Sequence, residues 1–191
     1  MSLILASASP RRRELLGLFH IPFQIRVADI DETMDPAGAP AEEVARVSRL
    51  KALAVSREPE DVVIAADTIV VCGGTVLGKP HSQQEAVDTL HLLSGRDHQV
   101  MTGVTVLRGD RAETFTEITD LHFRPLTDKE IDAYVASGEP MDKAGSYGIQ
   151  GGAALFCSAM TGDYYNVMGL PVCRLGLVLR QMAPDLMGEF L

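Results

Sequence analysis

The sequence predicts an α/β fold, because short apolar runs of strand length alternate with amphipathic stretches of helix length along the whole chain. The 191 residues, of which 46% are hydrophobic, suffice for one globular domain with a sizeable core. No repeat, low-complexity segment or linker divides the chain. We therefore expect a single domain over residues 1–191, and the pattern assigns no structure to the tail after residue 183.

The first half of the chain predicts a short buried strand that leads into a capped helix. Leu3-Ile4-Leu5-Ala6 is the strand, Ser9 fits the N-cap position and Pro10 fits the first helical position. The longest apolar run, residues 62–71, precedes the turn pair Gly73-Gly74 and predicts a central strand that enters a hairpin. Further strands are expected at residues 23–27 and 75–77, helices at residues 11–18 and 41–56, and an acidic loop at residues 28–40.

The second half continues the same alternation. Ser82 and Glu85 have the spacing of a capping box at the start of a helix over residues 82–93. Two strands, at residues 99–107 and 112–123, flank a turn and predict a long antiparallel hairpin. The remaining expectations are a helix at residues 128–137, a glycine-rich loop at 141–152, an apolar strand at 153–157 and a last helix at 171–182.

Composition and charge exclude several classes of protein. The chain carries 17 Lys+Arg against 26 Asp+Glu, with a net charge of −9 and a pI near 5.0, so it lacks the diffuse basic surface of a nucleic-acid binder. No apolar run has the roughly 18 residues of a membrane span, and the first positive charges follow the first apolar run, the reverse of a signal peptide. The three cysteines form no metal-ligand motif, which favours reduced thiols. We expect a cytoplasmic protein that binds neither nucleic acid nor membrane.

The segment from Ser7 to Arg13 is a candidate anion site. Free N–H groups at a helix start, the hydroxyls of Ser7 and Ser9, and the guanidinium groups of Arg11 and Arg12 together suit a phosphate chain. The alternative is an ordinary N-cap followed by solvated arginines. Arginines lie at the unfavourable end of the helix dipole, and a bound anion would offset that cost.

Asp67 lies inside the most apolar strand, with Thr68 beside it. An ionised carboxylate there costs several kcal/mol unless it is paired, binds a metal or faces a cleft. Asp67 is therefore a candidate general base or metal ligand. The alternative is an aspartate satisfied by backbone N–H groups, and Thr68 taken alone is ordinary strand composition.

Two lysines and an acidic run can complete a phosphate site. Lys79 lies between a glycine and a proline, which restrict the backbone around it, and can present a point charge to a phosphate, as can Lys51. Asp29, Asp31 and Glu32 can supply a carboxylate for Mg²⁺, which uses one or two carboxylates plus substrate phosphates. The alternatives are surface lysines and a solvated acidic loop.

The glycine-rich segment from Asp142 to Gly152 contains an aromatic residue and an amide, Gln150, and is typical of a loop that wraps a ligand or of plain tight turns. The five histidines have no metal-ligand spacing. The glycine motifs of dinucleotide-binding and P-loop enzymes are absent.

Taken together, these blocks resemble the Maf family of nucleoside triphosphate pyrophosphatases over residues Leu3 to Gln181. The match is specific because six separated blocks agree. The blocks are L-A-S-A-S-P-R-R-R-E-L-L (5–16), A-D-I-D-E-T (28–33), A-A-D-T-I-V-V (65–71), G-K-P (78–80), Y-V-A-S-G-E-P-M-D-K-A-G-S-Y-G-I-Q-G (134–151) and N-V-M-G-L-P (166–171).

The resemblance implies a mixed, elongated sheet with flanking helices in two lobes around a central cleft, related to the inosine triphosphate pyrophosphatases, in a homodimer. It implies hydrolysis of a nucleoside triphosphate to the monophosphate and pyrophosphate with a divalent cation, Mg²⁺ first and Mn²⁺ or Co²⁺ as alternatives. By the same resemblance, Asp67 is the proton acceptor. Arg11, Thr68 and Gln150 match the subgroup that acts on dTTP and UTP, whereas a sister subgroup acting on 7-methyl-GTP has a bulkier aromatic residue, a glutamine and a glutamate there.

The chemistry of Gln150 agrees with that subgroup. A uracil or thymine edge offers one donor and one acceptor, and a neutral amide has both complements, whereas a glutamate only accepts. A site that leaves a buried polar group of the ligand unpaired discriminates strongly against that ligand.

The implied mechanism is in-line attack of water on the α-phosphorus, with Asp67 taking the proton. The side chains expected to hold the triphosphate are Ser7, Ser9, Arg11, Arg12, Lys51 and Lys79. Glu32 is the expected metal carboxylate and Asp67 the competing candidate, since both roles need an ionised carboxylate near the phosphate. Leu50 departs from the glutamate common in the family at that place, and Arg13 adds a charge that the motif does not require.

Two alternatives stay open at this point. One is a nucleotide-binding regulatory protein linked to cell division or septum formation, with little turnover. The other is an enzyme with the same mechanism that acts on modified pyrimidine nucleotides, whose base edges are similar.

Overall fold

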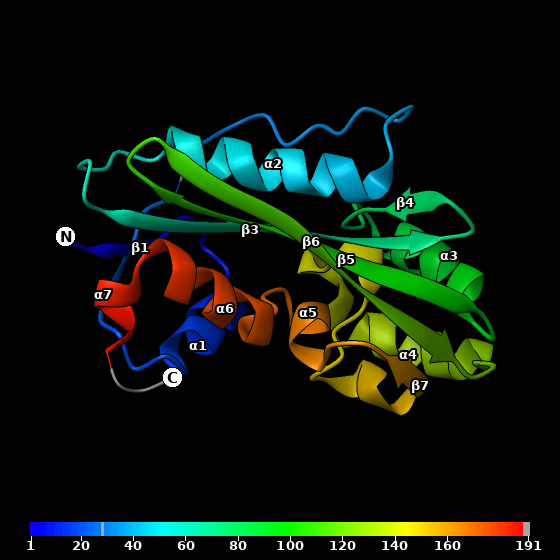
Figure 1. The fold of residues 1–191 in the computed structure, drawn as a ribbon. Helices are drawn as coiled ribbons and strands as arrows, with labels where there is room; N and C mark the ends of the chain where they lie inside the picture. The colour runs from blue at the N-terminus through cyan, green and yellow to red at the C-terminus, as the bar shows by residue number, and fades with distance from the viewer. Residues whose placement is uncertain (28, 189–191) are drawn as a thin grey trace. The chain divides into compact units, whose positions relative to one another are not determined.

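The computed structural model describes residues 1–27 and 29–188. Its strands form one mixed sheet in the order β2-β1-β3-β5-β6-β7, with β4 paired to β3, and helices flank it (Figure 1). This confirms the predicted α/β class. The expectations for Ala28 and for residues 189–191 lie outside the described residues. The strands are β1 (Leu3–Leu5), β2 (Phe23–Ile25), β3 (Val62–Cys72), β4 (Thr75–Leu77), β5 (Asp97–Arg108), β6 (Arg111–Phe123) and β7 (Cys157–Thr161).

The chain divides into two compact units, each built from segments far apart in sequence. The first unit contains residues 1–67, 102–117 and 169 onward, and the second unit contains residues 68–101 and 118–168. The strands β3, β5 and β6 each run from one unit into the other. Because the passages between units occur inside strands, the sequence contains no linker to mark them.

The first unit is built on parallel pairing. Strand β1 pairs in parallel with β2 and with β3, and its three residues are all buried. Its helices are α1 (Pro10–Gly17), α2 (Pro40–Ala54), α6 (Val172–Met182) and α7 (Pro184–Met187). Helix α2 lies directly against strand β5, since a Cβ at Gly103 would overlap the backbone carbonyl of Val44. This close approach fixes the height of α2 over the sheet, and with it the position of Lys51 on the buried face of the helix.

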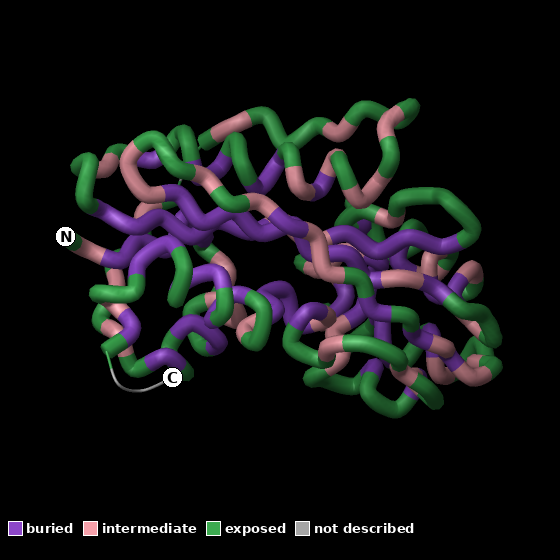
Figure 2. The backbone as a smooth tube through the Cα atoms, in the orientation of Figure 1, coloured by how far each residue is buried: buried purple, intermediate pink, exposed green. Residues whose placement is uncertain are grey.

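The second unit packs short helices against the other ends of the long strands. Its helices are α3 (Gln83–Leu93), α4 (Asp128–Ala136) and α5 (Tyr164–Met168), with 3₁₀ helices η1 (Glu139–Asp142), η2 (Ala144–Ser146) and η3 (Gly152–Leu155). Phe123 is fully buried and its ring packs edge-on against the rings of His98, Tyr147 and Phe156. Most residues of β1, β3 and β5 are buried, whereas those of β4 and β7 are partly buried or exposed (Figure 2).

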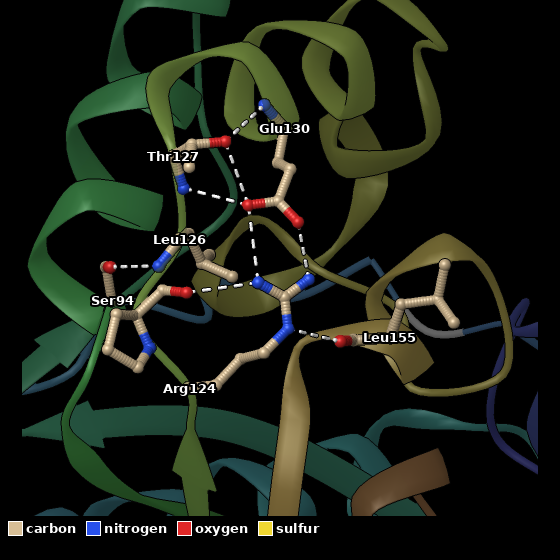
Figure 3. Close-up of polar contacts among 7 residues, drawn as sticks. Ser94, Arg124, Leu126, Thr127, Glu130 and Leu155 are labelled. Carbon is tan, nitrogen blue, oxygen red and sulfur yellow. Dashed lines mark hydrogen bonds and ion pairs between the residues drawn. The ribbon is translucent and has the colours of Figure 1, made fainter.

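Helix α4 begins with a complete capping box (Figure 3). The Glu130 N–H donates to the Thr127 hydroxyl at 3.3 Å, and the Thr127 N–H donates to the Glu130 carboxylate at 2.9 Å. The Arg124 guanidinium donates to the same carboxylate at 2.6 Å and to the Leu155 carbonyl at 3.0 Å. The bonds from Arg124, followed by those from Thr127, lower the pKa of Glu130 to about 2. The box therefore ties the start of α4 to the segment before β7.

Most predicted elements are confirmed, including the Ser9 cap, the two hairpins and the helix that follows Pro171. The capping box predicted at Ser82 is half formed. Ser82 accepts from the Glu85 N–H at 3.1 Å, but the Glu85 carboxylate accepts from the N–H of His81 and not from that of Ser82. The cap still satisfies two backbone donors at the start of α3.

The predicted apolar strand at residues 153–157 is wrong. Gly152–Leu155 forms η3, and strand β7 begins at Cys157. A short apolar run does not distinguish a strand from a helical turn, and Leu155 is 75% exposed and therefore not part of a core strand. Strand β7 is at the edge of the sheet, and its five residues are partly buried or exposed, so it has no apolar run to reveal it. The glycine-rich loop at residues 141–152 contains η2 and the end of η1, and the short helices α5 and α7 were not predicted.

Within the described residues, no helix combines the length and the apolar character needed to cross a membrane.

Candidate active site

The turn from β1 into α1 holds a fixed network of hydroxyl and guanidinium groups in the first unit. The Ser7 hydroxyl accepts from the Ser9 N–H at 3.2 Å and from Arg12 Nη1 at 3.3 Å. Ser9 caps the helix and accepts a long bond, 3.5 Å, from the Arg12 N–H. Arg12 Nε donates to the Gly169 carbonyl at 2.9 Å. The guanidinium of Arg12 is thus held at the positive end of α1, where an anion is favoured.

The charge around Arg12 is crowded. Burial lowers the pKa of the Arg12 guanidinium, and the nearby cation of Arg11 lowers it further, while the carboxylates of Asp67 and Glu32 act in the opposite direction. Two adjacent guanidinium groups at a helix N-terminus repel each other and the helix dipole. A polyanion bound there would relieve both effects.

Lys51 joins the two carboxylates of the predicted metal and base site. Its Nζ donates to Glu32 Oε2 at 2.7 Å and to Asp67 Oδ1 at 2.7 Å. The side chains of Lys51 and Asp67 are only 11% and 14% exposed, whereas that of Glu32 is 55% exposed. Asp67 is therefore paired with a lysine from α2, which offsets its desolvation inside β3. We call Glu32, Lys51 and Asp67 the charged triad.

The charged triad fits a divalent cation in the chemistry of its donors. Glu32 and Asp67 each accept a bond from the same cationic nitrogen, and carboxylate oxygens are ligands that a hard divalent cation prefers. No group of three or more His, Cys, Asp or Glu side chains with metal-site geometry occurs in the described part of the chain. Two carboxylates alone match Mg²⁺, which completes its shell with waters and substrate phosphates.

Two neighbours in the acidic loop behave differently from Glu32. The Asp31 carboxylate accepts from the Thr33 N–H at 2.9 Å, and bonding with Thr33 lowers the pKa of Asp31. Asp31 thus forms a local turn in the loop, as the solvated-loop alternative expected. Asp29 is exposed, as is Arg13 on α1.

Three predicted site residues lie in the second unit. Thr68 follows Asp67 on β3 and is partly buried, whereas Lys79 and Gln150 are exposed. The Gly145 N–H donates to the Gly78 carbonyl at 3.0 Å, so the backbone before Lys79 is tied to the glycine-rich segment that carries Gln150. The structure therefore places Lys79 and Gln150 on connected segments of one unit.

Gln150 is the third residue of a tight turn. The Gly151 N–H donates to the Gly148 carbonyl at 3.0 Å, which closes the turn over Ile149 and Gln150. The turn is held from η1 and α4 by Glu139 and Tyr134. Sequence reasoning gave no role to either residue, although both belong to the block that carries Gln150.

Known proteins resemble this chain in sequence and in fold. The chain matches the Maf-like protein family over residues 2–182. It belongs to the Maf family. Among its relatives are proteins named dTTP/UTP pyrophosphatase from Bacillus cereus (strain AH820) and Bacillus anthracis, each 48% identical over 184 residues, which is 96% of both chains. A HAM1 protein from Coxiella burnetii has a similar fold, with a TM-score of 0.51, 15% identity and coverage of 95% of this chain and 99% of that one.

In this Maf protein the sequence blocks that carry the family resemblance coincide with the described sites. The first block forms the β1–α1 turn with Ser7 and Arg12, and the A-A-D-T block forms the middle of β3. The two blocks with Lys79 and Gln150 are linked through their backbones. Leu50, which departs from the common pattern, is 38% exposed and lies beside Lys51 on α2, outside the contacts of the charged triad.

Proposed function

We propose that this Maf protein hydrolyses dTTP and UTP to the nucleoside monophosphate and pyrophosphate, by attack of water on the α-phosphorus. The observation that carries the proposal is the charged triad, in which Lys51 bonds to both Glu32 and Asp67, and Asp67 lies in the middle of an otherwise apolar strand. The names of the 48% identical relatives support the same substrates.

The β1–α1 turn would hold the triphosphate. Arg12 is immobilised by Ser7 and Gly169, and Arg11 lies on the same helix turn. Ser9 keeps the helix start in place by capping it. These groups, with Lys51 and Lys79, neutralise the phosphate oxygens and the charge that develops on the departing pyrophosphate.

Glu32 and Asp67 would also hold a divalent cation, for which we propose Mg²⁺, with Mn²⁺ or Co²⁺ as alternatives. When bound, such a cation supplies Lewis-acid polarisation of the phosphoryl oxygens. Lys51 donates to both of these carboxylates, and its ammonium group would be available to the phosphates if a cation were bound by Glu32 and Asp67. The large exposure of the Glu32 side chain allows that exchange of partners.

Asp67 is the proposed base. Its side chain is held in β3 by backbone pairing, and its Oδ1 bonds to Lys51 while Oδ2 can accept the proton of the attacking water. Base recognition is assigned to Gln150, whose amide complements the donor and acceptor of a uracil or thymine edge, with Thr68 and Arg11 as the other specificity positions. We further propose that the enzyme works as a cytoplasmic homodimer.

The test is a hydrolysis panel. The purified protein is given Mg²⁺ and each standard, 7-methylated or pyrimidine-modified nucleoside triphosphate in turn, and the products are separated by chromatography. We expect dTTP and UTP to be cleaved to monophosphate and pyrophosphate well above dCTP, GTP and 7-methyl-GTP, and a chelator to abolish turnover. Nucleoside diphosphate with orthophosphate as products would contradict attack at the α-phosphorus. Nucleotide binding without turnover would instead support the regulatory alternative linked to cell division, and faster cleavage of a modified pyrimidine would reassign the substrate.

A further inference from the structure

The turn that carries Gln150 is bonded on both sides to one pair of side chains in the second unit. Tyr134 lies on α4 and Glu139 begins η1, and the Tyr134 hydroxyl donates to Glu139 Oε1 at 2.9 Å. The same hydroxyl accepts from the Gly148 N–H at 2.9 Å. Glu139 Oε2 accepts from the Gly152 N–H at 3.1 Å. Bonds to Gly148, the first residue of the turn, and to Gly152, the residue after the turn, therefore bracket Gln150.

The Glu139 carboxylate packs closely against the backbone of the turn. A Cβ on Gly151 would overlap both oxygens of the Glu139 carboxylate. The carboxylate thus lies directly against the residue that follows Gln150. Lys143 supports the arrangement, since its Nζ donates to the Glu139 carbonyl at 2.6 Å and to Asp142 at 2.7 Å. The carboxylate itself is satisfied by a hydroxyl and a backbone N–H.

The hydroxyl of Tyr134 stays protonated, so its bond to Glu139 can persist at neutral pH. Burial raises the pKa of the Tyr134 hydroxyl and is the largest cause; the bond from the Gly148 N–H lowers it, and the Glu139 carboxylate raises it. Tyr134 therefore stays a donor at neutral pH. Its ring is fixed independently by an edge-on contact with Phe156 at 5.2 Å, so the hydroxyl is held in place by packing as well as by bonding.

We infer that Tyr134 and Glu139 are positioning residues for base selection, which clamp the turn so that the Gln150 amide has one orientation toward the pyrimidine edge. This inference rests on the proposed function of Gln150. An amide on a mobile turn could present its donor and its acceptor in several places, and discrimination between bases would then be small. The two side chains touch the backbone of the turn and have no proposed contact with the nucleotide.

The first experiment measures kcat and KM for dTTP and dCTP in the full-length protein with Tyr134→Phe, Glu139→Gln, Gly151→Ala and Gln150→Ala. Phenylalanine keeps the ring and removes only the hydroxyl, and glutamine keeps one of the two acceptor oxygens. We call Tyr134→Phe, Glu139→Gln and Gly151→Ala the clamp variants. In these three we expect the dTTP:dCTP ratio of kcat/KM to fall about 5- to 30-fold, and we expect a larger change in KM for dTTP than in kcat. Combined with Gln150→Ala, Tyr134→Phe should lower the ratio no further.

Tyr164→Phe is the matched control, because Tyr164 lies in the same unit and is 42% exposed. It should leave the ratio unchanged. An equal loss of kcat/KM for both nucleotides in the clamp variants, at unchanged ratio, would show a purely structural role and overturn the inference. The inference would also be overturned if Tyr134→Phe left the dTTP:dCTP ratio unchanged while Gln150→Ala abolished the preference for dTTP. In that case the proposed function would stand without the clamp.

A second measurement does not depend on turnover. Amide hydrogen exchange at Gly148 and Gly152 reports the two bonds directly, and we expect exchange at Gly148 to accelerate at least about tenfold in Tyr134→Phe. Unchanged exchange would overturn the clamp whatever the activity. Failure of the wild-type protein to prefer dTTP over dCTP, with the amides protected, would instead remove the proposed function and, with it, the role in base selection.

Discussion

The site residues of the two units are stabilised in different ways. In the first unit they form ion pairs, with Lys51 bonded to Glu32 and Asp67, and in the proposed mechanism these bonds are exchanged for bonds to phosphate or to a cation. In the second unit Gln150 lies on a turn whose backbone is bonded to Tyr134 and Glu139. Phosphate chemistry needs charges that can rearrange, whereas base discrimination needs an amide that cannot. Changes in the charged triad should therefore affect all nucleotides alike, and changes in the turn of Gln150 should affect them selectively.

The largest effect is expected from a change to Asp67 in the first unit. Asp67→Asn removes the proposed base and one partner of Lys51, and kcat should fall about 10²- to 10⁴-fold for every nucleotide, with binding affinity changed only a few-fold. Steady-state kinetics and equilibrium binding check this. Asp110→Asn, at the exposed turn between β5 and β6, is the matched control and should leave kcat unaltered. A fall in kcat for dTTP alone would contradict the expectation that the charged triad acts on all nucleotides alike.

The next effect concerns the core of the second unit. Burial lowers the pKa of His98 to about 4, although its Nε2 bonds to the Tyr147 hydroxyl at 2.9 Å. The unfolded chain binds a proton near pH 6.5 and the folded one does not, so stability is complete above pH 6.5 and falls as the pH drops toward 4. The free energy of unfolding should decrease by about 2 kcal/mol between pH 8 and pH 5 from this group.

Denaturant titration at several pH values measures this dependence. In His98→Gln the slope between pH 8 and pH 5 should be flatter, and His81→Gln, at an exposed histidine, should retain the wild-type slope. Because Tyr147 immediately precedes the turn of Gln150, base discrimination should weaken over the same pH range. An identical slope in His98→Gln would exclude His98 as the cause.

Gln150→Glu sharpens the comparison at the base. A glutamate cannot donate to the O4 atom of a pyrimidine, so kcat/KM for dTTP should fall about 10- to 100-fold while that for GTP falls less. Gln83→Glu, the same change at an exposed position on α3, is the control. Parallel kinetics with dTTP and GTP give the ratio. An equal fall in kcat/KM for both nucleotides would show that Gln150 acts on the phosphates and not on the base.

The smallest effect is structural. Thr127→Ala removes the cap of α4 and should lower the free energy of unfolding by about 1 kcal/mol, since the first turn loses an acceptor for its N–H groups. Thr75→Ala, at an exposed threonine of strand β4, should cost less. The dTTP:dCTP ratio of kcat/KM should stay constant in both variants, because the cap is at the opposite end of α4 from Tyr134. A changed dTTP:dCTP ratio in Thr127→Ala would show that the start of α4 also influences base selection.

Local features of the chain were predictable from its sequence. The Ser9 cap, the turn at Gly73-Gly74 and the helix after Pro171 depend on neighbouring residues, and each was predicted correctly. The short run at residues 153–157 failed because its apolar character suits a helical turn and a strand equally. The family blocks located the candidate site residues, but they did not show which side chains bond to one another.

The contacts between those side chains were decided by the tertiary structure. Lys51 reaches Asp67, 16 residues away, because α2 packs on the sheet, and Arg12 reaches the Gly169 carbonyl, 157 residues away. The clamp needs α4 and η1 to bring Tyr134 and Glu139 against glycines that look like ordinary loop residues in the sequence. Sequence periodicity and caps record local backbone preferences. Pairing between distant polar groups depends on how helices and strands pack together, and the sequence of a single segment does not contain that information.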